Sequence, residues 1–72
     1  MHPTTASVLA FIRDYFAQYH MSPTLREIAS MLSLGLSTIG RALDELEDQG
    51  YISRVRGRAR TIVLRREYDN RS

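Results

Sequence analysis

The sequence contains no cysteine, no lysine and no long hydrophobic run. The absence of cysteine excludes disulfides and thiolate metal sites, and it is consistent with a reducing cytoplasm. No apolar run approaches the roughly 18 residues that a membrane span requires. The N-terminal segment also lacks the basic region and apolar core of a signal peptide. We therefore expect a cytoplasmic protein, associated with the nucleoid of a bacterium or with a phage or mobile element, and no membrane partner.

The length of 72 residues predicts one small domain. A chain of this size buries only about 60 % of the surface that its unfolded form exposes. The hydrophobic fraction of 43 % suffices for a compact core. Since that leaves no room for a buried catalytic pocket with a cofactor, we expect no enzyme, no catalytic residue and no cofactor.

Metal and acid–base chemistry also lack the residues they need. His2 and His20 are far apart and have no cysteine beside them, so we interpret them as a stray N-terminal histidine and a helix-end histidine. The sequence has no glycine-rich phosphate loop. The acids between Asp44 and Asp48 are expected to line the solvated side of a helix.

Charge is distributed unevenly along the chain. The net charge is only +2, yet residues 50–66 hold six arginines and no acid, whereas residues 44–48 hold four acids. The basic segment should face a polyanion. Because arginine has a planar fork that suits phosphates and guanine edges, its exclusive use favours nucleic acid. A compositional bias of the genome explains the same usage equally well.

The spacing of apolar residues predicts two helices before a tight turn. The first runs from about Thr5 to Tyr19, with Thr4 or Thr5 as its N-cap. The second begins at Thr24 with the capping-box pattern T-x-x-E and ends near Ser33. Its inward residues are Leu25, Ile28, Ala29 and Leu32, and those of the first helix are Val8, Phe11, Ile12, Tyr15, Phe16 and Tyr19.

A third helix and a hairpin complete the expected fold. Gly35 is free to take a positive φ in the turn, the third helix starts near Ser37, and Gly50 stops it as a left-handed cap. Ile39, Leu43 and Leu46 face inward. Residues 51–56 and 60–65 are expected to form strands joined by a loop at 57–59. We predict a mainly α fold with a small β-hairpin, a winged helix-turn-helix in residues 1–66, followed by a flexible tail in residues 67–72.

The polar face of the third helix is the candidate for reading DNA bases. Residues near the start of such a helix reach base edges in the major groove. Arg41 can bind guanine bidentately, or it can form an intrahelical ion pair with Asp44 or Glu45. Gly40 indicates either close approach of a DNA backbone or neutral drift. The predicted recognition residues are Ser37, Thr38, Gly40, Arg41 and Asp44.

The hairpin supplies the second candidate contact. Its arginines Arg54, Arg56, Arg58 and Arg60 can lie along a DNA backbone or enter a narrow minor groove. The alternative is a solvated hairpin whose charges prevent edge-to-edge aggregation. Thr24 and Arg26, at the start of the second helix, are expected to contact the DNA backbone.

Four segments resemble the N-terminal DNA-binding domain of LexA-type repressors. They are IRDYF in the first helix, MSPTLREIA opening the second, LSTIGRAL in the third, and L-E-x-x-G-Y-I at its end. The resemblance covers about Val8 to Leu64. It implies a repressor that binds operators as a two-fold dimer. It also places Ser37, Thr38, Gly40 and Arg41 at the base-reading positions, and Arg58 on the wing.

The chain departs from the family pattern in three respects. Ser33 stands where the family commonly has glycine, and Gly40 replaces a side chain that usually faces DNA. The family's second domain, which supplies dimerisation and a Ser–Lys self-cleavage dyad, has no counterpart in these residues. Since the sequence has no lysine, we do not expect self-cleavage.

These observations predict a sequence-specific binder of double-stranded DNA that represses transcription, acting as a homodimer on an inverted repeat. The main alternative is a small winged-helix docking module, such as a mobile-element regulator that captures another regulator. Its protein partner would bind the acids at 44–48 or exposed Tyr51 and Tyr68. A third alternative is an architectural protein that binds all duplexes alike.

Overall fold

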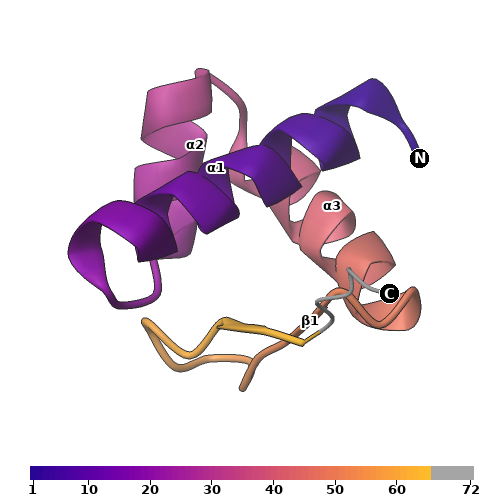
Figure 1. Cartoon of the computed structure of the whole chain (residues 1–72). Helices are drawn as coiled ribbons and strands as arrows, with labels where there is room; N and C mark the ends of the chain where they lie inside the picture. The colour runs from indigo at the N-terminus through magenta and orange to yellow at the C-terminus, as the bar shows by residue number, and fades with distance from the viewer. Residues whose placement is uncertain (66–72) are drawn as a thin grey trace.

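The computed structural model describes residues 1–65 and contains three helices followed by one antiparallel hairpin (Figure 1). The helices are α1 (Pro3–Tyr19), α2 (Leu25–Leu32) and α3 (Leu36–Asp48), and the strands are β1 (Ile52–Ser53) and β2 (Val63–Leu64). This is the order of elements that the sequence predicted for a winged helix-turn-helix. The expected tail at 67–72 lies outside the described residues.

The hydrophobic core joins all three helices to the hairpin. Val8, Ile12, Ile28, Ile39 and Leu43 are completely buried, and Ile62 closes the core from the hairpin side at 4 % exposure. Each helix therefore packs one face against the core and exposes its opposite face to solvent. The full set of buried apolar residues is Val8, Leu9, Ile12, Ile28, Ala29, Ile39, Ala42, Leu43, Leu46, Ile52 and Ile62.

The first helix ends at Tyr19 as predicted, but its start and the exposure of its last residue differ from the prediction. It begins at Pro3, because the Nδ1 atom of His2 accepts a hydrogen bond from the Thr4 amide at 3.1 Å and so acts as the N-cap. Thr5, a predicted cap, is buried, and its hydroxyl donates to Glu45 Oε1 at 2.6 Å. Tyr19 was predicted to face the core but is 52 % exposed, because the residues of α1 that reach the core end at Phe16; the Tyr19 ring lies tilted by 47° against that of Tyr15, at a centroid distance of 4.5 Å.

The helix-turn-helix confirms the capping box and corrects the turn. The Glu27 amide donates to Thr24 Oγ1 at 3.0 Å, and the Thr24 amide donates to Glu27 Oε1 at 2.9 Å. The left-handed residue after α2 is Ser33, with φ 57°, whereas Gly35 has φ −72° and serves as the N-cap of α3. The amides of Ser33 and Leu34 donate back to Ser30 O and Ala29 O, a pattern that requires the left-handed conformation at Ser33.

The third helix ends as predicted. Gly50 has φ 82°, and the amides of Gly50 and Tyr51 donate back to Glu47 O and Leu46 O. This is the same hydrogen-bond pattern that ends α2, with glycine at the left-handed position. The chain can therefore reverse into the hairpin directly after α3.

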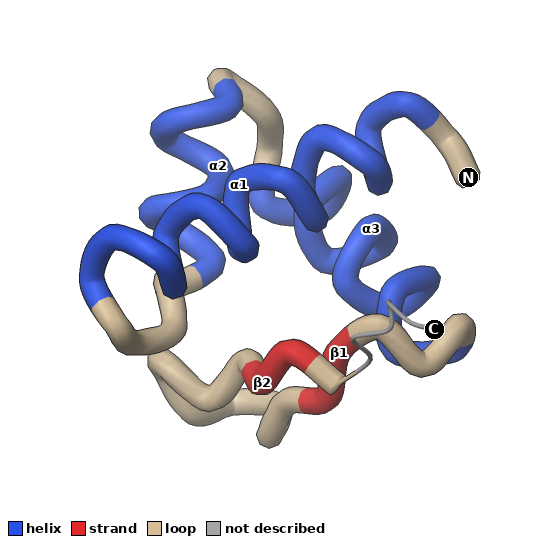
Figure 2. Tube along the Cα trace, viewed as in Figure 1, coloured by secondary structure: helices blue, strands red, loops and turns tan. Residues whose placement is uncertain are grey.

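The strands are shorter than predicted, and most of the hairpin is loop (Figure 2). Ile52 pairs with Leu64 and Ser53 with Val63. Beyond this point the Thr61 hydroxyl replaces the backbone ladder, since it accepts from the Val55 amide at 3.0 Å and its single proton is shared between the carbonyl oxygens of Val55 and Arg58, each 3.1 Å away. Gly57 and Arg60 have positive φ values, which a strand does not allow. Within residues 1–65, no helix is long and apolar enough to cross a membrane.

Candidate nucleic-acid interface

The predicted recognition residues share one face of α3. Ile39, Leu43 and Leu46 are fully buried on the opposite face and hold the helix in a single orientation. Ser37, Thr38 and Arg41 are exposed, and Gly40 and Asp44 are half-buried.

The intrahelical ion pair considered for Arg41 does not form. Asp44 is bonded to Arg54 and Arg56, while Glu45 is bonded to Thr5 and Gln49. Over the described part of the chain, the Arg41 side chain has neither a hydrogen bond nor a salt bridge, so its guanidinium is available to a ligand.

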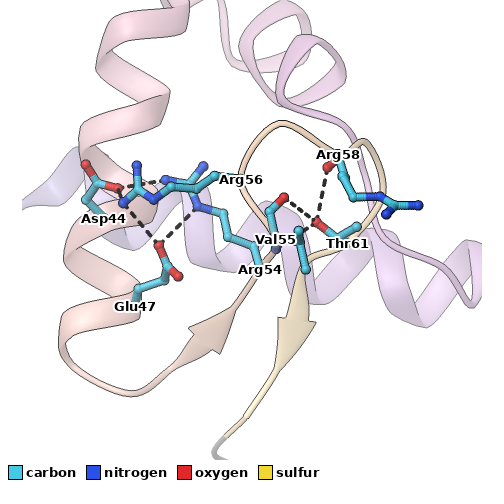
Figure 3. A network of polar contacts seen from close by, with 7 residues as sticks. All are labelled: Asp44, Glu47, Arg54, Val55, Arg56, Arg58 and Thr61. Carbon is cyan, nitrogen blue, oxygen red and sulfur yellow. Dashed lines mark hydrogen bonds and ion pairs between the residues drawn. The ribbon is translucent and has the colours of Figure 1, made fainter.

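Two acids of α3 are bound to the hairpin, so they do not simply line a solvated face (Figure 3). Arg54 Nη2 lies 2.7 Å from Asp44 Oδ1, and Arg54 Nε lies 3.1 Å from Glu47 Oε1. Arg56 also donates to Asp44 Oδ1. The hydrogen bond from Arg56 is the main cause that lowers the pKa of Asp44 below its usual value.

The four arginines predicted to contact DNA through the hairpin therefore differ in availability. The side chain of Arg54 is only 8 % exposed and is directed at α3, whereas that of Arg56 is 68 % exposed. The guanidinium of Arg58 points away from the acids (Figure 3), and among residues 1–65 its side chain has no bonded partner. Arg58 is thus both exposed and unbonded within this range, whereas Arg56 is exposed but bonded to Asp44.

Arg60 attaches the other end of the hairpin to α2. Its guanidinium donates to Glu27 Oε2 at 2.9 Å, to the Ser22 carbonyl at 2.9 Å and to the Tyr15 hydroxyl at 3.2 Å. The backbone bond from Thr24, followed by the bond from Arg60, lowers the pKa of Glu27, and the bond to Glu27 raises the pKa of Arg60. The loop that carries Arg58 is consequently held from both sides.

It was not predicted from the sequence that Arg54, Arg60 and their acidic partners hold the hairpin against α3 and α2. The only available signal was the succession of an acidic segment and a basic segment on either side of Gly50. That pattern predicts attraction between the segments, but it does not say which arginine meets which acid.

A groove runs between the start of α2, the exposed face of α3 and the hairpin loop. Gly40 of α3 lies in it, with Arg26 contributed by α2 and Arg58 by the loop. Thr24, whose hydroxyl already accepts the capping bond, borders the same groove. The lining residues are Thr24, Leu25, Arg26, Gly40, Asp44, Arg54, Arg56, Gly57, Arg58 and Ala59. Within residues 1–65, no cluster of histidines and acids is arranged to hold a metal ion.

Residues 2–61 match the family described as the LexA DNA binding domain. The LexA repressor of Geobacter metallireducens is 40 % identical over 63 residues, which are 86 % of this chain and 31 % of that protein. LexA repressor 1 of Nocardia farcinica is 34 % identical over 59 residues, which are 81 % of this chain and 27 % of that protein. The chain thus spans about a third of the length of these relatives.

A solved structure supports the fold. A possible transcriptional regulator, YydK from Bacillus subtilis, superposes with a TM-score of 0.64 at 24 % identity, over 90 % of this chain and 30 % of that one.

Proposed function

Because the chain belongs to the LexA DNA-binding domain family, we propose that it binds a specific double-stranded DNA sequence and represses transcription from it. The observation that supports this most directly is Arg41, which is exposed on α3 and has no bonded partner within residues 1–65, together with a hairpin loop that presents Arg58. The first element is suited to base edges and the second to phosphates.

The exposed face of α3 reads the major groove in this proposal. Arg41 binds a guanine through its O6 and N7 atoms, the bidentate contact that discriminates best between bases. Ser37 and Thr38, in the first turn of α3, bind phosphate or base edges, and the Thr38 methyl group can contact thymine. Asp44 is neutralised by Arg54 and Arg56, so its charge does not repel the duplex strongly.

The hairpin loop and the start of α2 bind the DNA backbone. Arg58 reaches phosphates beside the major groove, and Arg56, which is bonded to Asp44 through Nη2 but is 68 % exposed, adds a contact through its remaining N–H groups. Arg26 and the Thr24 hydroxyl reach the strand from α2. Arg54 and Arg60, which the sequence suggested as direct contacts, act as positioning residues because their guanidinium groups are bonded to Asp44, Glu47 and Glu27.

We expect two copies to bind an inverted repeat, since a single recognition helix covers only one half-site. Such a regulator works in the cytoplasm, beside the chromosome. The dimer contact and the repressing activity of the whole protein are parts of the proposal.

The experiment is selection of bound duplexes from a randomised pool at near-physiological salt, with the double variant Arg41→Ala, Arg58→Ala as the control. An enriched inverted repeat supports the proposal in full. A single enriched half-site supports sequence-specific binding but rejects the dimer. If the wild type enriches nothing and does not bind duplex at low salt, DNA binding is rejected.

A docking module is the second candidate, and one observation favours it. The surface between α1 and α2 exposes Tyr19, Met21 and Met31, the last at 69 %. Exposed methionines and aromatic residues are common on protein-binding surfaces. Failure of the duplex selection would move this function to first place.

A further inference from the structure

Gly40 is a residue that the fold does not explain. It lies in the middle of α3, where glycine is among the poorest helix formers. Gly50 and Gly57 have positive φ values, whereas Gly40 does not. A Cβ atom added at Gly40 would meet nothing within 4 Å. Neither backbone conformation nor internal packing therefore requires glycine at this position.

The surroundings of Gly40 are suited to a polyanion. It lies in the groove between Arg26 at the start of α2 and Arg56 and Arg58 of the hairpin loop. Four arginines and a single acid, Asp44, line this groove. The same Oδ1 atom of Asp44 accepts from both Arg54 and Arg56, so the acid is already neutralised.

We propose that one sugar–phosphate strand of the bound duplex runs in this groove and passes directly over the backbone of α3 at Gly40. Arg26 binds its phosphates from the side of α2, and Arg58 binds them from the side of the loop. The inference rests on the proposed DNA binding and adds Gly40 as a residue that determines the affinity for DNA. The missing side chain at position 40 allows the strand to approach, because any side chain there projects into the space that the strand occupies.

The test compares Gly40→Ala and Gly40→Leu with the wild type. Ala10→Leu is the matched control, because Ala10 is an exposed residue of α1 outside the groove. Two duplexes of equal length serve as probes: one recovered by the selection described above, and one unselected. Affinity is measured over a range of salt concentrations, and thermal unfolding is followed by circular dichroism.

Stability and affinity should change in opposite directions. Both Gly40 variants should unfold at a higher temperature, by about 4–8 °C for alanine, because a helix-breaking residue is replaced. Gly40→Ala should weaken binding about fivefold and Gly40→Leu about fiftyfold or more, the range of a lost base-pair contact. Both duplexes should be affected, and the salt dependence for Gly40→Leu should be flatter by about one released ion, because a phosphate contact is lost. Ala10→Leu should bind as the wild type does.

Other outcomes overturn the inference in distinguishable ways. If Gly40→Leu is stabilised and binds within about twofold of the wild type, no strand lies over Gly40, although DNA binding stands. If only the selected duplex is weakened and the salt dependence is unchanged, a base edge lies there instead of a strand. If the wild type binds neither duplex, the proposed function fails together with this inference. Since Gly40→Ala adds a single methyl group to open space, it keeps the test valid even if the leucine variant folds poorly.

Discussion

Replacing Ser33 with glycine is expected to stabilise the protein. Ser33 has φ 57° and ψ 44°, the left-handed conformation, and its side chain is exposed. A residue with a Cβ atom pays about 1–2 kcal/mol in this conformation, which glycine avoids. Glycine also makes the unfolded chain more flexible, and this offsets about 0.4–1 kcal/mol of the gain. The expected net stabilisation is about 0.5–1 kcal/mol.

Thermal unfolding by circular dichroism or calorimetry measures this effect. A gain of that size raises the Tm of a domain of this length by about 2–8 °C. Affinity for DNA should stay within about twofold of the wild type, because Ser33 does not line the groove beside α3.

Two variants serve as matched controls. Gly50 occupies the same place at the end of α3 that Ser33 occupies at the end of α2. Gly50→Ser should therefore destabilise the protein by a similar amount or more. Ser30→Gly, at an exposed position inside α2, should destabilise it by about 0.5 kcal/mol through poorer helix propensity. If Ser33→Gly lowers the Tm as Ser30→Gly does, the assignment of strain to the left-handed Ser33 is refuted.

Three further predictions concern the interface and its supports. Arg41→Ala should lower affinity by about 1–3 kcal/mol, mainly at one base position, as measured on operators mutated base by base; an equal loss on all operators would contradict a base contact. Arg58→Ala should weaken all duplexes about equally and reduce the salt slope by about one; a sequence-selective loss would instead put Arg58 on a base edge. The third concerns pH. The pKa of Glu27 in the folded protein is lowered below its ordinary value of 4.5. Its charge therefore stabilises the fold fully above pH 4.5, and this stabilisation is lost as the pH falls through the folded pKa. Glu27→Gln keeps an acceptor for the Thr24 amide but removes the charge, so the Tm difference between wild type and variant should shrink below pH 4.5; a difference that is constant with pH would contradict the lowered pKa that the bonds from Thr24 and Arg60 cause.

Much of the helix-turn-helix could be predicted because its signals are local. The capping box at Thr24 and the left-handed stop at Gly50 depend on neighbouring residues, and both were predicted from a few letters of sequence. The left-handed residue of the turn was assigned to Gly35 because glycine takes positive φ most readily. The hydrogen-bond pattern that ends α2 required that conformation at Ser33 instead, since the position is set by where the helix stops.

The hairpin was predicted less well for a related reason. β-Branched residues at Val55 and Thr61 favoured long strands, but the Thr61 hydroxyl satisfies the backbone of Val55 and makes further pairing unnecessary. A side chain that competes with the backbone for hydrogen bonds is difficult to recognise from composition. The separate roles of the arginines were also difficult to predict. Arg54, Arg56, Arg58 and Arg60 alternate with small or apolar residues in one short segment, so their sequence neighbours do not distinguish them.

The sequence by itself determined the family, the order of helices and hairpin, and the exposed face of α3 that carries Arg41. These follow from the spacing of apolar residues and from local caps, which act over one or two helical turns. Only the tertiary structure decided which arginines are free. Arg54 meets Asp44 and Glu47, and Arg60 meets Glu27 across 33 positions of sequence, whereas Arg58 is left exposed. The physical reason is that an ion pair depends on the distance between side chains in space, and that distance is set only when the three helices close on a common core.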